Sequence, residues 1–169
     1  MPDIAAPSEA VRPSSEISIR PFQPGDEEAF RSLNEQWITK YFSIEAQDRL
    51  VLGNPEHHIL RPGGRILMAI SGAKPIGCCA LIYVRPGVFE VAKMAVAEDY
   101  QGKGAGRKLL QHIIAEARAM GATLLDLGSN SKLTNAIHLY ESVGFRHVPP
   151  ERIVPMPYTR VDVFMELVL

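Results

Sequence analysis

The stretch DYQGKGAGRKLL, residues 99–110, places three glycines, a lysine and an arginine at the approach to a helix. A β-rich run precedes it, and an apolar stripe with the helical period of about 3.6 follows it. Glycines lack a Cβ atom, so backbone N–H groups can close on an anion, to which a helix N-terminus adds about half a positive charge. We therefore predict a strand, turn and helix that hold a pyrophosphate, or a turn that only lets the chain enter the helix.

Three phosphate-binding patterns compete for this turn. A P-loop would need Ser or Thr after the Gly-Lys pair, but Gly104 follows Lys103. A dinucleotide fingerprint would need G-x-G-x-x-G after the first strand of a βαβ unit, whereas Gly102, Gly104 and Gly106 have the spacing G-x-G-x-G after a series of hairpins. The pattern Q/R-x-x-G-x-G/A fits from Gln101 to Gly106. The turn thus matches a pyrophosphate site between a strand and a long helix.

The first third of the chain predicts a strand followed by two helices. Apolar and polar residues alternate around Ile17 and Ile19, which favours a strand. A helical pattern then starts near Asp26. A second short helix is expected with Ser43 as its N-cap and Gly53 as its stop.

The rest of the chain predicts a meander and then alternating helices and strands. Three β-rich runs, GRILMAIS, KPIGCCALIYV and GVFEVAKMAVA, are separated by turn sequences that favour antiparallel hairpins. A helix that closes at Gly121, a buried strand, a helix that ends at Gly144 and two final strands follow. This order of elements predicts an α/β domain with a mixed sheet.

Composition indicates one ordinary domain. The chain has 169 residues, 46% of them hydrophobic and 22% charged, with a formal net charge of -1. Residues 1–15 are rich in Pro, Ser and Ala and are expected to form a mobile leader, so we place a single domain at 16–169. The basic residues form no cluster, so binding to nucleic acid or to an anionic membrane is not expected. The sequence shows neither a signal peptide nor a long apolar run. We expect a cytoplasmic protein.

The two cysteines, Cys78 and Cys79, are neighbours on an expected strand. Their side chains should therefore point to opposite faces of the sheet, which excludes a disulfide between them. We interpret them as core thiols in a reducing compartment. The five histidines do not have the spacing of metal ligands, so no metal is expected.

Three segments resemble the GNAT superfamily of acyl-CoA-dependent N-acetyltransferases: EVAKMAV at 90–96, QGKGAGRKLL at 101–110 and NAIHLYESVGF at 135–145. The order of the other elements also agrees with the fold of that family. The resemblance implies a mixed, mostly antiparallel sheet of six to seven strands flanked by about four helices. It also implies that two parallel strands, 91–96 and 124–127, splay apart to form an acyl-CoA cleft.

The resemblance implies acetyl-CoA as co-substrate. Splayed strands leave buried backbone groups unpaired, and the pantetheine arm would bond them. The N–H of Met94 or of its neighbour would polarise the thioester carbonyl, as in an oxyanion hole. The residues implied to bind the cofactor are Met94, Ala95, Val96, Gln101, Gly102, Lys103, Gly104, Ala105, Gly106 and Asn135.

Tyr140 is the first candidate for catalysis. In the resemblance it matches a tyrosine whose hydroxyl points at the CoA sulfur and can protonate the departing thiolate; the alternative is a tyrosine that only packs in the core. Many family members have an asparagine seven residues earlier, where this chain has Leu133. Asn130 and Asn135 flank that position, and the sequence leaves open which of them contacts the cofactor.

Glu90 is the second candidate. It stands eleven residues before Gln101, an offset at which some family members place a catalytic glutamate. Strand parity places it on one face with Ala92 and Met94, where burial could raise its pKa enough for a general base. The alternatives are a glutamate paired with a nearby cation, and a chain of water molecules as the base.

The expected function is transfer of an acetyl group from acetyl-CoA to a primary amine of a small molecule or peptide, by direct attack on the thioester. The alternative is an acyl-CoA-binding sensor or interaction module without catalysis. The acceptor should enter beside an aromatic wall of Trp37, Tyr41, Phe42 and Tyr158, unless these residues only pack in the core. The expected partners are acetyl-CoA and an amine, with neither nucleic acid nor membrane, and a homodimer is compatible with them.

Overall fold

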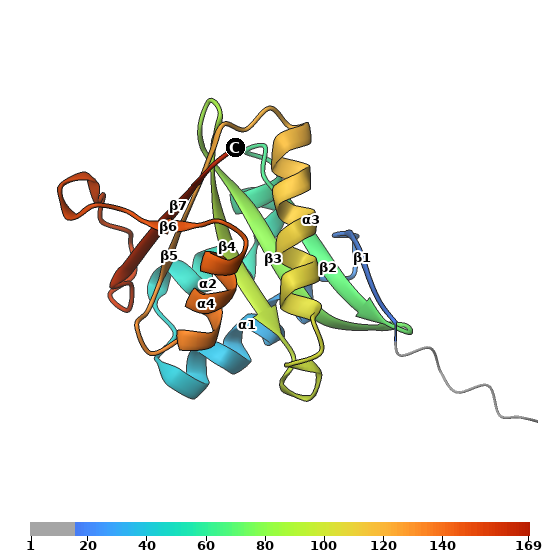
Figure 1. Ribbon diagram of the computed structural model, residues 1–169. Coiled ribbons are helices and arrows are strands. Elements are labelled where there is room, and N and C mark those ends of the chain that lie inside the picture. Colours follow the sequence, from blue (N-terminus) through green and yellow to red (C-terminus); the bar gives the residue numbers. More distant parts are fainter. Residues whose placement is uncertain (1–15) are drawn as a thin grey trace, which may run out of the picture.

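The computed structural model describes residues 16–169, so the leader expected at 1–15 lies outside the described residues. A seven-stranded sheet has the order β1-β2-β3-β4-β5-β7-β6, and every neighbouring pair is antiparallel except β4 and β5 (Figure 1). The strands are β1 (Ile17–Pro21), β2 (Arg65–Ser71), β3 (Lys74–Arg85), β4 (Val88–Val96), β5 (Leu124–Ser129), β6 (Arg146–His147) and β7 (Val163–Val168). The predicted fold class is confirmed.

Helices cover both faces of the sheet. The described helices are α1 (Glu27–Tyr41), α2 (Ala46–Gly53), the π-helical turn η1 (Glu56–Leu60), the 3-10 turn η2 (Glu98–Tyr100), α3 (Ala105–Ala119), α4 (Thr134–Ser142) and the 3-10 turn η3 (Pro150–Arg152). Helices α3 and α4 pack on one face, and α1 and α2 pack on the other (Figure 1). The sheet is therefore the middle of three layers.

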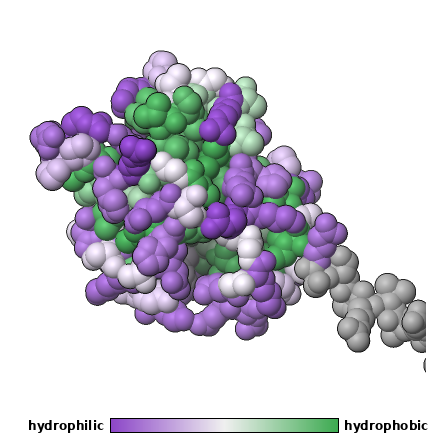
Figure 2. All heavy atoms as spheres, in the orientation of Figure 1, coloured by the Kyte–Doolittle hydropathy of each residue, from purple (hydrophilic) through white to green (hydrophobic). Residues whose placement is uncertain are grey.

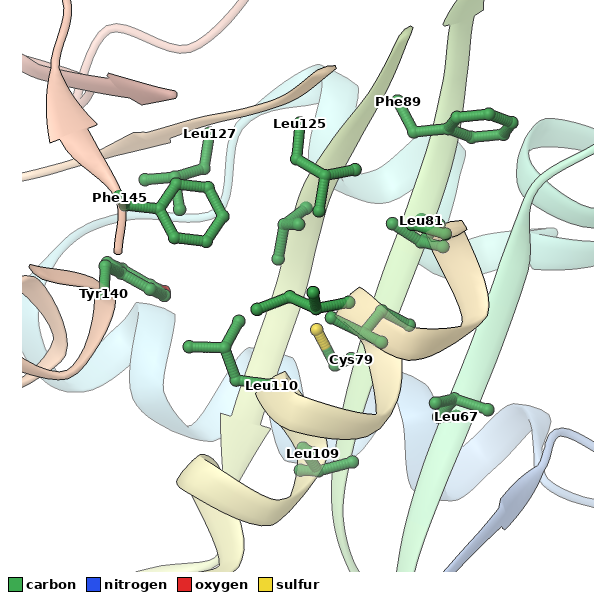
Figure 3. Packing of buried hydrophobic residues seen from close by; sticks show 14 of the residues in the cluster. Leu67, Cys79, Leu81, Phe89, Leu109, Leu110, Leu125, Leu127, Tyr140 and Phe145 are labelled. Atoms are coloured by element: carbon green, nitrogen blue, oxygen red, sulfur yellow. The ribbon is translucent and has the colours of Figure 1, made fainter. Parts of the chain in front are cut away.

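Each face of the sheet has its own hydrophobic core. On the α3 side, Leu109 and Leu110 belong to the same core cluster as the strand residues Leu81 and Leu125, and Figure 3 shows this cluster. On the α1 side, Phe30 packs in a second cluster with residues of α2, β2 and β3. The neighbours Cys78 and Cys79 belong to different clusters and are both free thiols, as predicted.

The two helices of the first third both begin after an acidic N-cap residue. Asp26 is the N-cap of α1, as expected. The prediction that Ser43 caps α2 is wrong, because the N-cap is Glu45. The backbone N–H of Glu45 donates to Asp48 Oδ2 at 2.9 Å. The helix therefore starts two residues later than the sequence predicts. Gly53 is the last residue of α2.

A β-bulge in β4 changes the faces that simple parity predicts. Lys93 and Met94 together stand opposite Cys79 on β3, and Lys93 has a φ of 52°. Glu90 pairs with Ile82, which packs on the α1 side, whereas Met94 packs against the α3-side core. The expectation that Glu90 and Met94 share a face is therefore wrong, because the extra residue reverses the alternation after the bulge.

The parallel pair β4 and β5 separates along its length. The last paired residues are Glu90 and Asp126, although β4 continues to Val96 and β5 to Ser129. Beyond that point the facing edges of the two strands are not bonded to each other. The predicted splay is thus confirmed, and it opens a gap in the middle of the sheet.

Polar residues cover most of the face shown in Figure 2, and hydrophobic residues gather in its upper part. The large hydrophobic residues that are exposed include Tyr83, Val84 and Val168, which lie near the C-terminal ends of β3 and β7. Within residues 16–169, no helix combines the length and the apolar character that a bilayer crossing requires.

Candidate active site

A cavity of about 750 Å³ opens where β4 and β5 separate. Its walls come from six parts of the chain: the second half of β4, the turn before α3, the end of β5, α4, the C-terminal end of α1 and the loop before β7. The splay therefore brings together residues from position 37 to position 161 of the chain.

Eleven of the twelve site residues predicted from the sequence line this cavity, namely Glu90, Met94, Ala95, Val96, Gln101, Gly102, Gly104, Ala105, Gly106, Asn135 and Tyr140. Lys103 is not among the lining residues. Its ammonium group lies 5.3 Å from the centroid of the Tyr100 ring. The turn therefore faces the cavity mainly with its backbone, and the Lys103 side chain lies outside the lining.

The glycine turn leaves the start of α3 open. Gly104 is the N-cap, with a φ of 84°, and no side chain caps the helix. The first turn of α3 also contains no acidic residue. Uncapped N–H groups at a helix start suit an anion, because they are unsatisfied donors at the positive end of the helix dipole.

Gln101 fastens this turn to the sheet. Its side-chain Nε2 donates to the carbonyl oxygen of Val96 at 3.1 Å. The bond joins the residue before the glycines to the last residue of β4. The unpaired end of the strand and the open end of the helix are therefore held next to each other.

Tyr140 lies on α4 and is 9% exposed. Its ring packs edge-on against Phe145, with the centroids 6.0 Å apart, at the end of the core nearest Leu127 (Figure 3). Within the described part of the chain, its hydroxyl has no hydrogen-bond partner. Burial raises the pKa of this phenol far above its ordinary value, so the hydroxyl keeps its proton.

Glu90 lies at the point where the strands separate. Burial raises its pKa to about 7, and the negative charge of Asp126, its pairing partner on β5, adds to the effect, whereas the charge of Lys93 opposes it. The carboxyl group therefore changes charge near neutral pH. Within residues 16–169, no group of three or more His, Cys, Asp or Glu side chains is placed to hold a metal ion.

The two asparagines near α4 differ in how their amides are used. The Nδ2 of Asn130 donates to the carbonyl oxygen of Arg160 at 2.7 Å, and its Oδ1 accepts from the N–H of Lys132 at 2.9 Å. Asn130 thus shapes the loop between β5 and α4. Asn135 is exposed on the first turn of α4 and lines the cavity.

A buried charge network, which the sequence analysis missed, stands beside the cavity. Asp48 on α2 is fully buried and accepts two hydrogen bonds of 2.7 Å from Arg160. The Nζ of Lys93 donates to Asp48 at 3.0 Å and to the hydroxyl of Tyr158 at 2.9 Å. Glu45 accepts from Arg160 at 3.2 Å. Sequence spacing carries no signal for a pair 112 positions apart.

The four aromatic residues predicted for the acceptor side, Trp37, Tyr41, Phe42 and Tyr158, all line the cavity. Trp37 and Phe42 meet edge to face, with centroids 6.5 Å apart. Tyr41 is 47% exposed and lies at the edge of the wall. The end of the cavity at which the sequence analysis expects the acceptor therefore has an aromatic lining.

A parallel strand pair that separates over the open start of a helix agrees with the acyl-CoA cleft that the resemblance of the sequence implies. The Acetyltransferase (GNAT) family matches residues 26–145, and the chain belongs to this family. It is thus an acyltransferase enzyme.

Relatives of this chain carry names of the same kind. It is 30% identical over 105 residues to the uncharacterized N-acetyltransferase YvbK of Bacillus subtilis, a match that covers 60% of this chain and 68% of YvbK. It is 42% identical over 59 residues to the [ribosomal protein bS18]-alanine N-acetyltransferase of Escherichia coli, and 46% identical over 50 residues to the L-amino acid N-acyltransferase MnaT of that organism. These two matches cover 35% and 30% of this chain, and 40% and 29% of those proteins.

Solved structures share the fold. A GNAT-family acetyltransferase of Staphylococcus aureus Mu50 superposes with a TM-score of 0.81 at 23% identity, and the match covers 89% of this chain and 98% of that one. The acetyltransferase yncA of Salmonella typhimurium, solved with acetyl-CoA, has a TM-score of 0.69 at 24% identity over 91% of this chain and 94% of its own.

Asp48 should stabilise the fold in a pH-dependent way. Burial alone would raise its pKa, but hydrogen bonds from Arg160 and from the Glu45 N–H, together with the charge of Lys93, lower it from 3.8 to about 2. A lowered pKa means that the stabilisation is present above about pH 4 and is lost as the pH falls towards 2. Asp48→Asn should reduce the free energy of unfolding by about 3 to 5 kcal/mol at pH 7.

Urea titrations of both proteins at several pH values would measure this difference. It should shrink as the pH falls from 4 towards 2, because the wild-type carboxylate then becomes protonated too. A difference that stays constant over this range would contradict the charged state assigned to Asp48.

Proposed function

We propose that this acyltransferase moves the acetyl group of acetyl-CoA to a primary amine of a small molecule or peptide. The main support for this proposal is that the open start of α3, the unpaired end of β4, Tyr140 and Glu90 all line one cavity. A cavity that only bound acyl-CoA would need neither a buried phenol nor a carboxyl group that titrates near neutral pH. The architecture therefore favours catalysis over the sensor or interaction module.

Backbone groups are proposed to hold the co-substrate. The pyrophosphate would lie against the turn of 101–106, where the N–H groups of α3 have no side-chain cap. The pantetheine arm would pair with the free edge of β4 from Met94 to Val96. An N–H at Met94 or its neighbour would then stabilise the developing oxyanion, a contribution of about 3 to 4 kcal/mol. The yncA structure, described as containing acetyl-CoA, supports this co-substrate.

Two side chains are proposed to manage the protons. An ammonium of pKa about 10.4 must lose its proton before attack, which costs about 4.6 kcal/mol at pH 7. Glu90 takes this proton as a general base, directly or through water. The amine nitrogen then bonds to the thioester carbonyl carbon, and as the C–S bond breaks the nitrogen loses its second proton to water. Tyr140 gives its proton to the departing thiolate and takes a new one from water.

The pyrophosphate site can be tested with Gly104→Val. Gly104 has a φ of 84°, so a β-branched side chain would both distort the turn and block close approach of an anion. We expect the affinity for CoA, measured by calorimetry, to fall at least about tenfold, or 1.4 kcal/mol. Gly121→Val is the matched control, because Gly121 has a φ of 81° at the other end of α3. Equal losses in both variants would argue against the site.

The role of Tyr140 can be tested with Tyr140→Phe. The variant keeps the ring and its packing on Phe145 but removes the proton donor, so turnover should fall by about 10² to 10⁴. The melting temperature and the CoA affinity should stay close to those of the wild type. Thiol release across a panel of amines would measure turnover. A purely structural tyrosine would give the opposite pattern, with Phe tolerated and only Tyr140→Ala harmful.

The role of Glu90 can be tested through the pH dependence of kcat/KM. With a pKa of about 7, Glu90 is largely protonated at low pH and ionised above neutrality, so the wild-type rate should rise through pH 7. Glu90→Gln should lack this rise. Its loss of kcat/KM relative to the wild type should be largest near about pH 8 and reach about 10²-fold. Nearer the pKa of the amine, the deficit should close, because the amine then loses its proton without help.

Asp126→Asn provides the control for the Glu90 assignment. Asp126 faces Glu90 across the strand pair and helps to raise its pKa. Its removal should therefore shift the acidic limb of the wild-type profile to lower pH without abolishing turnover. A limb that persists unchanged in Glu90→Gln would assign the base to another group.

A further inference from the structure

The acceptor end of the cavity holds charges that already have partners, and the inference drawn from this rests on the proposed function. Two cations line this end, Lys93 and Arg160, whose side chains are only 5% and 9% exposed. Both bind Asp48, which is fully buried, at 3.0 Å and 2.7 Å. Glu45 takes a second bond from Arg160 at 3.2 Å. Two buried cations thus face two acids.

An acceptor carboxylate would have to compete with Asp48 for these cations. Asp48 belongs to α2 and is held by the N–H of Glu45 as well, so it cannot withdraw into water. A carboxylate that displaced it would leave a buried charge without its partner, which is strongly unfavourable. Lys93 and Arg160 are therefore poor receptors for an anion, although they line the cavity.

Aromatic rings cover the faces that Arg160 would otherwise offer. Its guanidinium carbon lies 4.6 Å from the centroid of Tyr158 and 5.7 Å from that of Trp37. Lys93 is likewise 4.6 Å from the Tyr158 centroid. The two cations that line the cavity are therefore packed against aromatic rings.

The remaining charges favour an amine and not an acid. Glu90 lines the cavity and has no ion-pair partner within residues 16–169. Lys132 is an exposed lysine of the rim, with its ammonium 5.7 Å from the Phe42 centroid. An exposed lysine attracts an anion only weakly, because water and salt screen it. The interior of this end therefore carries one unpaired acid and no unpaired cation.

We propose that the acceptor is a primary amine with an aromatic or apolar body and no carboxylate on the carbon that bears the amine. Asp48 is the specificity-determining residue, because it keeps Arg160 and Lys93 occupied. Free amino acids are then poor acceptors, whereas the corresponding decarboxylated amines and amino-acid amides are good ones.

Matched acceptors test the proposal on the wild-type protein. We would compare kcat/KM for phenethylamine, phenylalaninamide and phenylalanine, with spermidine as a hydrophilic amine, by thiol release from acetyl-CoA. Phenylalaninamide keeps the bulk at the α-carbon without the negative charge. The kcat/KM values for phenethylamine and phenylalaninamide, which lack the carboxylate, should exceed the value for phenylalanine at least about 100-fold. Equal rates for phenylalanine and its amide would overturn the proposal, as would turnover confined to spermidine.

The same panel separates this inference from the proposed function. If acetyl-CoA binds and no amine is acetylated, the proposed function itself fails. If phenylalanine is acetylated as well as its amide, the enzyme is an N-acetyltransferase and only the role of Asp48 in excluding acids is wrong.

Variants test whether Asp48 sets the preference. Asp48→Asn frees the two cations, so the ratio of kcat/KM for phenylalaninamide over phenylalanine should fall at least about tenfold, with CoA affinity changed less than about twofold. Asp26→Asn is the control, since it also breaks an ion pair of a buried aspartate, in which the partly exposed Arg20 donates to Asp26 at 2.6 Å, but Asp26 does not line the cavity. Its ratio should equal that of the wild type.

Glu45→Gln covers the case in which Asp48→Asn does not fold. Glu45 is less buried, and Gln can still accept from the N–H of Thr159, which lies 2.9 Å from the carboxylate. The variant removes one negative charge from the network and should lower the same ratio at least about threefold. An unchanged ratio in the folded variants would overturn the proposal.

Discussion

The separation of β4 from β5 after the pair Glu90 and Asp126 is the constraint on which the rest of this structure depends. Buried backbone groups need partners, so a sheet opens in its centre only where something else will bond its edges. Here the opening exposes the end of β4 to a cavity, and the side chain of Gln101 fastens the open start of α3 beside it. Apart from Lys103, the residues proposed to bind the cofactor, the two catalytic candidates and the aromatic residues proposed for the acceptor side all border this one gap.

Burial shifts the two catalytic candidates in the same direction with different chemical results. It raises the pKa of Tyr140 far above its ordinary value, which keeps the phenol protonated near neutral pH and also makes it a weaker acid. It raises the pKa of Glu90 only to about 7, which leaves a carboxyl group able to take a proton under ordinary conditions. The proposed division into acid and base rests on the proton that each group carries near neutral pH.

A buried charge network connects the elements at the end of the cavity that is proposed for the acceptor. Asp48 joins α2 to the loop before β7 through Arg160, and to the bulge of β4 through Lys93. A buried ion-pair network costs desolvation, so it adds little net stability while its loss is expensive. Here it fixes Tyr158 and the bulge of β4 next to each other at the border of the cavity.

The sequence by itself determined what depends on near neighbours: the glycine turn, the helix end before Gly121, the opposite faces of the two cysteines, and, through the resemblance of three segments, the family and its splayed sheet. Only the tertiary structure decided that the bulge at Lys93 turns Met94 away from Glu90. The same holds for the network around Asp48. Spacing encodes periodicity and turns, whereas a bulge depends on register with the partner strand, and a buried charge depends on what the fold brings against it.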